Sequence, residues 1–244
     1  MTQVNISYLP AGDTGLTVQF EGDSPRATNA RALQLHRLLA EKPLRGVIET
    51  VPTFRSLTVH YDPGRTSQAE LVDGIGRLSG DLDGGGLREP DRWRLPVCFD
   101  QDGFAPDLQE VARQTGLSTA EILDALTGTV QSVYMLGFVP GQPYLGDLPE
   151  ALSIPRRQNP VGKVRAGSVL TATARTVVYP VENPTGWYVV GCTPLPLFRP
   201  DDEFPTLLQP GDEVVFEPIS KNEFQRLYDQ RERYRLTPET GRSP

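Results

Sequence analysis

The stretch GSVLTATARTVVYPVENPTGWYVVG, residues 167–191, contains three short apolar segments that are rich in β-branched and aromatic residues. Turns containing Gly and Pro separate these segments, and residues of this kind favour strands over helices. Similar segments lie on either side, at QSVYMLGF (131–138) and EVVFEPI (213–219). Many short strands at this spacing are typical of an all-β barrel or sandwich, which we predict between residues 130 and 217.

Helices and one further strand are predicted around this β region. WRLPVCF (93–99) is predicted to be a strand, and Gly116 is predicted to end the helix that follows it. The predicted start signals of three helices are Pro106 and the capping-box pairs Ser118/Glu121 and Ser220/Glu223. The second half of the chain is therefore predicted to be a β domain with a few short helices.

The first 80 residues alternate between predicted strands and helices. Ser24 and Pro25 predict the start of a helix that runs to about Ala40, and Ser67 with Glu70 predicts the capping box of a second helix. The strand candidates are VNISYL (4–9), LTVQF (16–20), VIET (47–50) and SLTVHYD (56–62). This order predicts a small α/β domain.

The stretch SGDLDGGGLREPD, residues 79–91, has four glycines and four acidic residues. Such a composition is typical of a flexible linker, so we predict a domain boundary there. The predicted organisation is an α/β domain at 1–80, a linker at 81–91, a β-barrel domain at 92–219, and a C-terminal helix and tail at 220–244.

The composition predicts a folded protein of the cytoplasm. Hydrophobic residues make up 38% of the 244 residues and charged residues 23%, which is enough apolar material for a core. The sequence contains no run of 18 apolar residues, so no membrane span is predicted. The first residues also lack a secretory signal pattern. Cys98 and Cys192 match no metal or redox spacing, which favours a reducing compartment.

Charge and histidine content argue against two classes of function. The net charge of −7 argues against a general nucleic-acid binder. His36 and His60 are the only histidines, so hydrolytic machinery that needs several of them is excluded, and we expect no metal site. His36 is predicted to lie in a helix and His60 on a strand, where a structural role is favoured for each.

One segment of the second domain differs from the rest of the chain. Residues 137–200 hold 10 of the 23 prolines, with six basic residues against three acidic ones. A positive segment in an acidic chain suits an anionic ligand such as a carboxylate or phosphate, but ordinary surface ion pairs explain the same arginines equally well. The string GFVPGQPYLGDLP (137–149), with three glycines and three prolines, predicts a rigid loop that either binds a ligand or only wraps the barrel.

Nucleotide-binding motifs of the P-loop and Rossmann type are absent from the sequence. A nucleotide, if bound, is therefore held in another way. Tyr179 and Trp187 could stack on a ligand, and core packing explains them at least as well.

A series of motifs in one order carries a family resemblance. The series is MLGFVPGQPYLGDLP (135–149), PRR (155–157), AGSV (166–169), YP (179–180), GW (186–187) and TPLPLF (193–198), preceded by GVIETVPTFRSLTVHYDP (46–63). It resembles the family that holds the sporulation kinase A inhibitor and the B subunit of 5-oxoprolinase. The same module is called allophanate hydrolase subunit 1 and recurs, as carboxyltransferase subdomains C and D, in urea carboxylase. The likeness covers about residues 5–219.

The resemblance implies an α+β chain with a small ferredoxin-like α/β N-terminal domain and a cyclophilin-like β-barrel C-terminal domain. It also implies a heteromeric 5-oxoprolinase complex in which this chain works with two partners, the companion C subunit together with the A subunit. Such a complex hydrolyses 5-oxoproline to L-glutamate with ATP and magnesium, and no cofactor is covalently bound. Phosphorylation of the lactam oxygen would turn a poor electrophile into one with a leaving group.

Several residues depart from the pattern that the family commonly shows. Polar residues of the family are replaced at three positions, and Asp147 stands where the family usually has Gly. The family commonly has a His where this chain has Leu126, and an Arg where it has Val161 and Cys192. Arg165 and Arg175 stand where the family has a Pro and a Gln. The departures leave the implied fold intact and weaken the inference of standard activity.

We place the candidate site on the barrel near loop 137–149. Asp147 is the only carboxylate in that loop, and no catalytic residue is assigned. The predicted substrate- or nucleotide-binding residues are Gly141, Pro143, Tyr144, Arg156, Arg157, Arg165, Ser168, Arg175, Tyr179 and Trp187.

Three functional hypotheses remain open at this point. The first is a subunit of an ATP-dependent 5-oxoprolinase-type amide hydrolase with a small anionic substrate. The second is a non-catalytic inhibitor of a histidine kinase, for which the lost polar residues argue. The third is a subunit of a carboxyltransferase- or allophanate hydrolase-type complex. None of them involves nucleic acid or a membrane.

Overall fold

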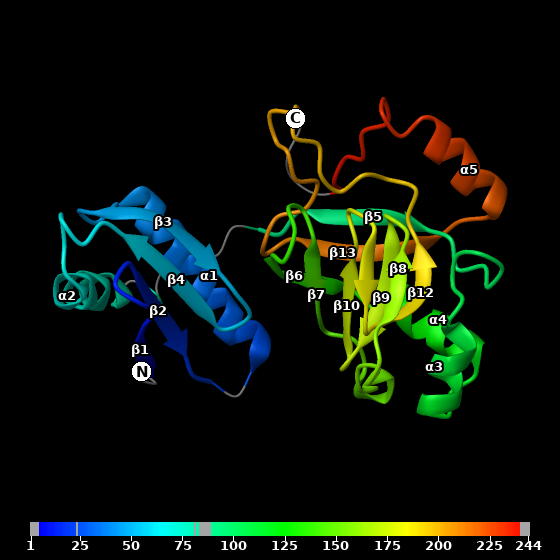
Figure 1. The fold of residues 1–244 in the computed structure, drawn as a ribbon, viewed down its shortest axis with the longest axis horizontal. Coiled ribbons are helices and arrows are strands. Elements are labelled where there is room, and N and C mark those ends of the chain that lie inside the picture. The colour runs from blue at the N-terminus through cyan, green and yellow to red at the C-terminus, as the bar shows by residue number, and fades with distance from the viewer. Residues whose placement is uncertain (1–4, 23, 81, 83–88, 240–244) are drawn as a thin grey trace. The chain divides into compact units, whose positions relative to one another are not determined.

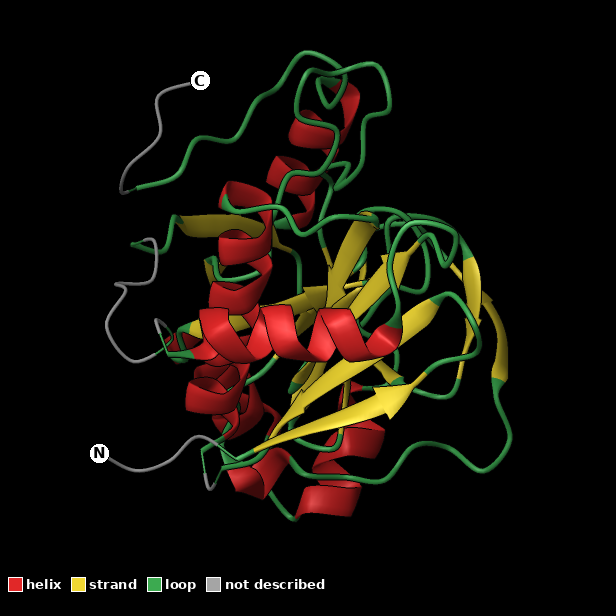
Figure 2. Cartoon of the chain, turned by 90° about the vertical axis from the view of Figure 1, so that its left-hand side faces the viewer, coloured by secondary structure: helices red, strands yellow, loops and turns green. Residues whose placement is uncertain are grey.

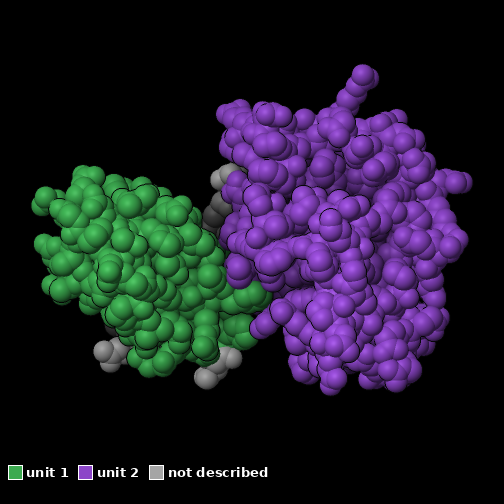
Figure 3. Space-filling view, viewed as in Figure 1, with its two compact units in different colours: residues 1–89 green, residues 90–244 purple. Residues whose placement is uncertain are grey.

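The computed structural model describes residues 5–22, 24–80, 82 and 89–239, and the chain forms two compact units, Met1–Glu89 and Pro90–Pro244 (Figures 1 and 3). The division falls within the predicted linker, of which residues 81 and 83–88 lie outside the described residues. Both units contain helices and strands, so the chain is α+β (Figure 2). Within the described part, no helix is long and apolar enough to cross a membrane.

The first unit is a four-stranded antiparallel sheet with two helices. The sheet order is β1-β2-β4-β3. The elements are β1 (Ile6–Pro10), β2 (Gly15–Phe20), α1 (Pro25–Glu41), β3 (Val47–Pro52), β4 (Ser56–Tyr61) and α2 (Gln68–Ser79). Alternate residues of β2 and β4, such as Val18 and Val59, are buried with the apolar sides of both helices because strand side chains alternate between the two faces.

The predicted helix starts of this unit are confirmed. The Ser24 hydroxyl accepts a hydrogen bond from the Ala27 amide at 3.4 Å, with Pro25 as the first helical residue. Ser67 and Glu70 form a complete capping box at the start of α2.

The second unit is built on a seven-stranded sheet of order β12-β9-β10-β7-β6-β13-β5. Its pairs are antiparallel except for β13 with β5, which are parallel. The sheet strands are β5 (Arg92–Val97), β6 (Gln131–Leu136), β7 (Pro143–Leu145), β9 (Ser168–Ala172), β10 (Arg175–Val178), β12 (Tyr188–Cys192) and β13 (Glu213–Pro218). β8 (Val161–Val164) and β11 (Asn183–Thr185) pair as a separate two-stranded antiparallel sheet.

The two edges of the seven-stranded sheet meet at the two cysteines. Cys98, directly after β5, and Cys192, at the end of β12, exchange two backbone hydrogen bonds of 2.8 and 2.9 Å. This antiparallel bridge makes the sheet a nearly closed barrel. Pro194 and Pro196 follow Cys192 and have no N–H groups to donate, so the pairing does not continue along this side. We call the line where β5 faces residues 192–197 the seam.

The barrel interior is one apolar core shared with two helices, α3 (Leu108–Thr115) and α4 (Thr119–Gly128). Val133, Val169 and Val214 from three strands pack there. Leu126 of α4 is fully buried in the same core, so the position where the family commonly offers a His is an interior position in this chain.

Two predicted helix starts in this unit need correction. Helix α3 begins at Leu108 rather than at Pro106, with Asp107 as its N-cap residue. The Asp107 carboxylate does not cap the helix, because it accepts from Arg157 and from the Val189 amide instead. Helix α5 (Lys221–Asp229) has only half of its predicted capping box: the Ser220 hydroxyl accepts from the Glu223 amide, but the Glu223 side chain pairs with Arg226 at 2.6 Å. The box at Ser118 and Glu121 is complete, and Gly116 ends α3 as predicted, with φ of 75°.

Candidate functional site

Four of the predicted site residues come together on the barrel face that is turned away from the main core. Tyr144 of β7, Tyr179 after β10 and Trp187 before β12 lie in one apolar cluster with residues such as Leu170. The Arg156 guanidinium carbon lies 5.0 Å from the centre of the Trp187 ring. We call Tyr144, Arg156, Tyr179 and Trp187 the outer cluster.

Two members of the outer cluster are fixed by the chain around them. The Tyr179 hydroxyl donates to Thr185 Oγ1 at 3.1 Å, and the Trp187 amide donates to the same oxygen at 2.9 Å. Both side chains are buried, with 6% exposure each. Their rings therefore form the floor of the cluster, and Thr185 of β11 ties the two-stranded sheet of β8 and β11 to that floor.

The other two members carry the accessible polar groups. Arg156 is exposed, and Tyr144 is half-buried. Burial raises the pKa of Tyr144, and Tyr179 raises it further, whereas Arg156 and a hydrogen bond with Gln142 lower it. The net pKa is above the ordinary value, so the Tyr144 hydroxyl remains protonated at neutral pH.

Gln142 adds a buried acceptor beside Tyr144. Its side chain is 2% exposed, and its Oε1 has no hydrogen-bond partner within the described residues. A buried amide oxygen without a partner is unfavourable by about 1–3 kcal/mol, and such groups are often functional. The arrangement thus offers a hydroxyl donor, a guanidinium and an amide oxygen, which suit a small molecule with both an amide and an anionic group.

Loop 137–149 has the rigid shape that its Gly and Pro content predicts. Gly141 has φ of 75°, and a Cβ there would lie 2.7 Å from Phe198 Cβ, so only glycine fits. Asp147 also has a positive φ, 74°, which explains why the family usually has Gly at this position. Its carboxylate accepts hydrogen bonds from the hydroxyls of Ser132 and Tyr134, both at 2.6 Å, so it holds the end of the loop.

Arg157 follows Arg156 in the chain but makes a different set of contacts. Its guanidinium donates to Asp107 at 2.5 Å and lies 4.3 Å from the centre of the Tyr188 ring. The second oxygen of Asp107 accepts from the Val189 amide at 2.8 Å. These contacts tie α3 to β12, which is a structural arrangement.

Arg165 lies at the seam, away from the outer cluster. Its guanidinium carbon is 5.3 Å from the Phe104 ring centre and 5.2 Å from that of Phe224 in α5. Burial raises the pKa of the nearby Cys192 thiol to about 12, with Arg165 opposing the shift. Cys192 is therefore protonated and is a poor nucleophile.

The remaining predicted residues lie in separate places. Ser168 is 1% exposed, pairs with Cys192 across β9 and β12, and its hydroxyl has no partner within the described residues. Arg175 is exposed at the start of β10, four residues before Tyr179. Pro143 begins β7. Arg156, Arg157 and Arg165 therefore make separate contacts and do not converge on one anion site. The ligand contacts of all four predicted arginines stay predictions.

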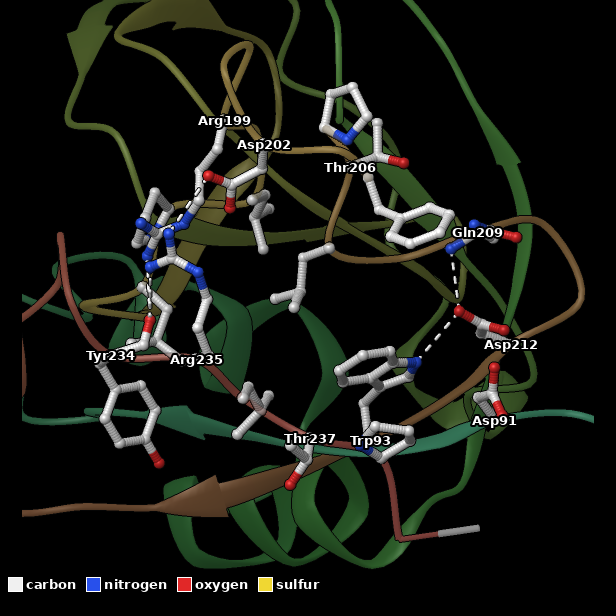
Figure 4. A pocket seen from close by; sticks show the side chains of 18 of the residues that line it. Asp91, Trp93, Arg199, Asp202, Thr206, Gln209, Asp212, Tyr234, Arg235 and Thr237 are labelled. Atoms are coloured by element: carbon white, nitrogen blue, oxygen red, sulfur yellow. Dashed lines mark hydrogen bonds and ion pairs between the residues drawn. The ribbon is translucent and has the colours of Figure 1, made fainter. Parts of the chain in front are cut away.

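A cavity of about 480 Å³ opens at the seam (Figure 4). Of the ten site residues predicted from the sequence, all of which the structure describes, none lines it. Its walls come from three segments far apart in the chain, at 91–93, 195–212 and 234–238. The sequence signal that could have indicated it is the alternation of prolines in TPLPLF beside a predicted strand edge.

No group of three or more His, Cys, Asp or Glu side chains in the part of the chain that the structure describes is arranged to hold a metal ion.

Comparison with known proteins gives one family and several relatives. A family model described as the carboxyltransferase domain, subdomain C and D, matches residues 6–208. The 5-oxoprolinase B subunit of Bacillus subtilis (strain 168) is 35% identical over 229 residues, which cover 87% of this chain and 92% of that protein. The 5-oxoprolinase B subunit of Escherichia coli O157:H7 is 36% identical over 209 residues, covering 85% and 93%.

A solved structure, that of TTHA0988, is similar to this chain in both fold and sequence. It superposes with a TM-score of 0.72 at 32% identity over 84% of this chain. The match covers 40% of the TTHA0988 chain, so this chain corresponds to less than half of that protein.

Proposed function

The chain belongs to the family of the carboxyltransferase domain, subdomains C and D, and on that basis we propose that it is a subunit of an ATP-dependent 5-oxoprolinase-type hydrolase. The observation that carries this proposal is its similarity, over nearly the full length, to proteins named as the B subunit of 5-oxoprolinase. The name of those relatives implies partner subunits. We propose that these are the companion C subunit together with the A subunit.

The domain types implied by the resemblance belong to the same proposal. The order β1-β2-β4-β3 corresponds to a ferredoxin-like sheet whose last strand has moved to the start of the chain. For the second unit, the nearly closed barrel with two peripheral helices supports a cyclophilin-like assignment.

We place the reaction site at the outer cluster. Arg156 is exposed over Trp187 and is suited to hold the carboxylate of 5-oxoproline or a phosphate. The protonated Tyr144 hydroxyl is suited to donate to the lactam oxygen, and Gln142 Oε1 to accept from the lactam N–H. The site thereby orients an amide and an anion together, and the partner subunits supply the remaining groups.

ATP enters this proposal as a co-substrate of the whole complex. Transfer of its γ-phosphoryl group to the lactam oxygen would release ADP. Water would then add to the activated carbon, and the C–N bond would break as the nitrogen takes up a proton, which gives γ-glutamyl phosphate. A second water would hydrolyse this acyl phosphate to glutamate and phosphate. Arg156, Arg157 and Arg165 make separate contacts and do not form one site for a triphosphate. We therefore assign the Mg·ATP site to another subunit or to an interface with one.

The test is reconstitution of the complex. The chain is mixed with the two partner subunits, and glutamate and ADP are measured with 5-oxoproline and Mg·ATP. ATP-dependent glutamate formation that disappears when this chain is omitted is the expected result. A complete, co-eluting complex that forms no glutamate would refute the proposal.

The two alternatives stay predictions and are separated by companion measurements. A kinase inhibitor would bind a histidine kinase of the same organism and lower its autophosphorylation. A carboxyltransferase- or allophanate hydrolase-type subunit would support turnover of a urea-like amide in place of 5-oxoproline.

A further inference from the structure

Three connections between strands meet at one end of the barrel. Residues 137–142 join β6 to β7, and the antiparallel pairing of β7 with β10 places residues 179–183, which follow β10, at the same end. The antiparallel pairing of β9 with β10 and with β12 places the segment that follows β12 there as well. We call residues 137–142, 179–183 and 197–206 the loop end.

Two segments of the loop end are in direct contact. Residues 197–207 form a hairpin, in which the Arg199 amide donates to the Pro205 carbonyl at 2.7 Å. The base of this hairpin lies against the first loop, because a Cβ on Gly141 would lie 2.7 Å from Phe198 Cβ. The two loops therefore form one continuous part of the surface.

The loop end carries the most exposed large apolar side chains that the structure describes in the second unit. Phe138 is 72% exposed, Phe204 is 64% exposed and Val181 is 48% exposed. Phe204 also lines the cavity at the seam, which we call the seam cavity. Single exposed apolar residues are common on proteins, but three at one end of a barrel are typical of an interaction surface.

Phe138 is held in this exposed position by a strained backbone. Its φ is 73°, a left-handed conformation that bulky side chains rarely adopt. Two hydrogen bonds close the loop around it, from the Gly137 amide to the Gln142 carbonyl at 3.1 Å and from the Gln142 amide to the Val139 carbonyl at 3.2 Å. Strained positions persist where the surrounding structure fixes them, and they concentrate at functional sites. The loop thus presents the Phe138 ring to solvent in a fixed place.

The charge of the loop end is negative. It holds four acidic residues and one basic residue, Arg199. Asp202 pairs with Arg235 at 3.2 Å, whereas the other three acidic residues, Glu182, Asp201 and Glu203, are exposed beside Val181 and Phe204. Such a surface repels a second copy of itself and favours a partner surface that carries Lys or Arg.

The loop end adjoins the outer cluster. Tyr179 belongs to both, and Gln142 of the loop end forms a hydrogen bond with Tyr144 of the cluster. A protein seated on the loop end therefore reaches the edge of the outer cluster, where the proposed reaction needs groups that this chain does not supply.

We propose that the loop end docks the companion C subunit, with Phe138 anchored in an apolar pocket that has Lys or Arg at its rim. A few buried aromatic anchors usually supply most of the affinity of such an interface. This inference rests on the proposed function, from which the identity of the partner is taken, and it adds the docking surface and the anchor residue.

The first experiment measures the dissociation constants of the chain with the purified C subunit and with the purified A subunit, each by isothermal titration calorimetry. Phe138→Asn removes the ring, and Asn tolerates the left-handed backbone, so the variant is expected to fold. We expect it to bind the C subunit about 10- to 100-fold more weakly. The matched control is Ile48→Thr, at a 70% exposed residue of β3 in the first unit, which should change the affinity by less than about 3-fold.

Two further measurements keep the test independent of one variant. Phe204→Ser, on the neighbouring hairpin, should weaken binding of the C subunit about 10-fold. In the wild-type chain, the amides at 137–142 and 201–204 should exchange hydrogen more slowly when the C subunit is bound. Asp201→Asn combined with Glu203→Gln should slow association and make it less sensitive to salt, because charges at the rim of an interface act mainly on the association rate.

Three results would overturn the docking proposal. They are no binding of the C subunit by the wild-type chain, binding of the A subunit alone, and unchanged affinity for the C subunit in folded Phe138→Asn and Phe204→Ser variants. Failure of the 5-oxoprolinase assignment would look different: binding of the C subunit would depend on Phe138, but the complete complex would form no glutamate.

Discussion

The outer cluster and the seam cavity lie on the same barrel but are assembled in different ways. Tyr144, Arg156, Tyr179 and Trp187 come from 44 consecutive residues, within the Pro-rich positive segment. The seam cavity joins segments at 91–93, 195–212 and 234–238. A site assembled from neighbouring strands leaves a local pattern in the sequence, whereas a site at a strand edge depends on which distant segments meet there.

The largest expected effect concerns the seam. Burial raises the pKa of Cys192 from 9.0 to about 12. Above pH 9 the unfolded chain releases this proton and the folded chain keeps it. The contribution of this thiol to the free energy of unfolding is therefore constant below about pH 9. It should then fall by up to about 1.4 kcal/mol per pH unit towards pH 12.

Denaturant unfolding from pH 8 to 11, for the wild type and Cys192→Ala, measures this contribution. The difference in unfolding free energy between the two proteins should shrink as the pH rises. Parallel curves would show that the buried thiol does not carry the predicted shift.

The next effect separates a partly buried ion pair from an exposed one. Arg157→Ala leaves the Asp107 carboxylate, whose side chain is 20% exposed, without its ion-pair partner. We expect the free energy of unfolding to fall by about 2–3 kcal/mol. In Arg113→Ala, which removes a 72% exposed partner of Glu110, the loss should be below about 1 kcal/mol. Similar losses in both variants would mean that the Arg157–Asp107 ion pair stabilises the fold no more than an exposed pair does.

Within the outer cluster, two tyrosines should respond in opposite ways. Tyr144→Phe removes the proposed donor to substrate and should lower kcat/KM of the reconstituted complex about 10-fold. Tyr179→Phe removes the hydrogen bond to Thr185 and should lower the free energy of unfolding by about 1 kcal/mol with little change in kcat/KM. The reverse pattern would make Tyr179, and not Tyr144, the substrate contact.

The smallest effect is expected at the end of the tail. Glu239 pairs with Arg94 at an exposed position. Glu239→Ala should therefore lower the free energy of unfolding by less than about 1 kcal/mol, because Arg199 still holds the tail through three carbonyls. Hydrogen exchange of the amides at 231–239 is the measurement, and a large, selective increase there would contradict this division of roles.

Local patterns predicted most of the strands and helices. The apolar segments of the second unit became β6, β9, β10, β12, β13 and β5, and capping pairs marked α2 and α4, because strand alternation and capping depend on near neighbours. The short β7, β8 and β11 were not predicted, since three or four residues carry too little pattern. The half-formed box at Ser220 and Glu223 shows that a nearby arginine, Arg226, competes for the capping carboxylate.

The site was predictable only in part. Tyr144, Tyr179 and Trp187 lie in a segment whose aromatic residues and rigid loop indicated a shaped surface. The roles of Arg157 and Arg165 depend on Asp107 and Phe224, which are distant in the chain, so charge alone did not distinguish them from Arg156. The seam cavity depends on strand closure at Cys98 and Cys192, which the spacing of the cysteines does not encode.

The central claim is that the outer cluster carries the substrate contacts of a 5-oxoprolinase-type subunit, and kcat/KM of the reconstituted complex with Arg156→Ala tests it most directly. Arg226→Ala, on an exposed face of α5, is the matched control. We expect kcat/KM for 5-oxoproline to fall about 10- to 100-fold in Arg156→Ala, with the complex intact and with near-normal activity in Arg226→Ala. Full activity of an intact Arg156→Ala complex would contradict the claim.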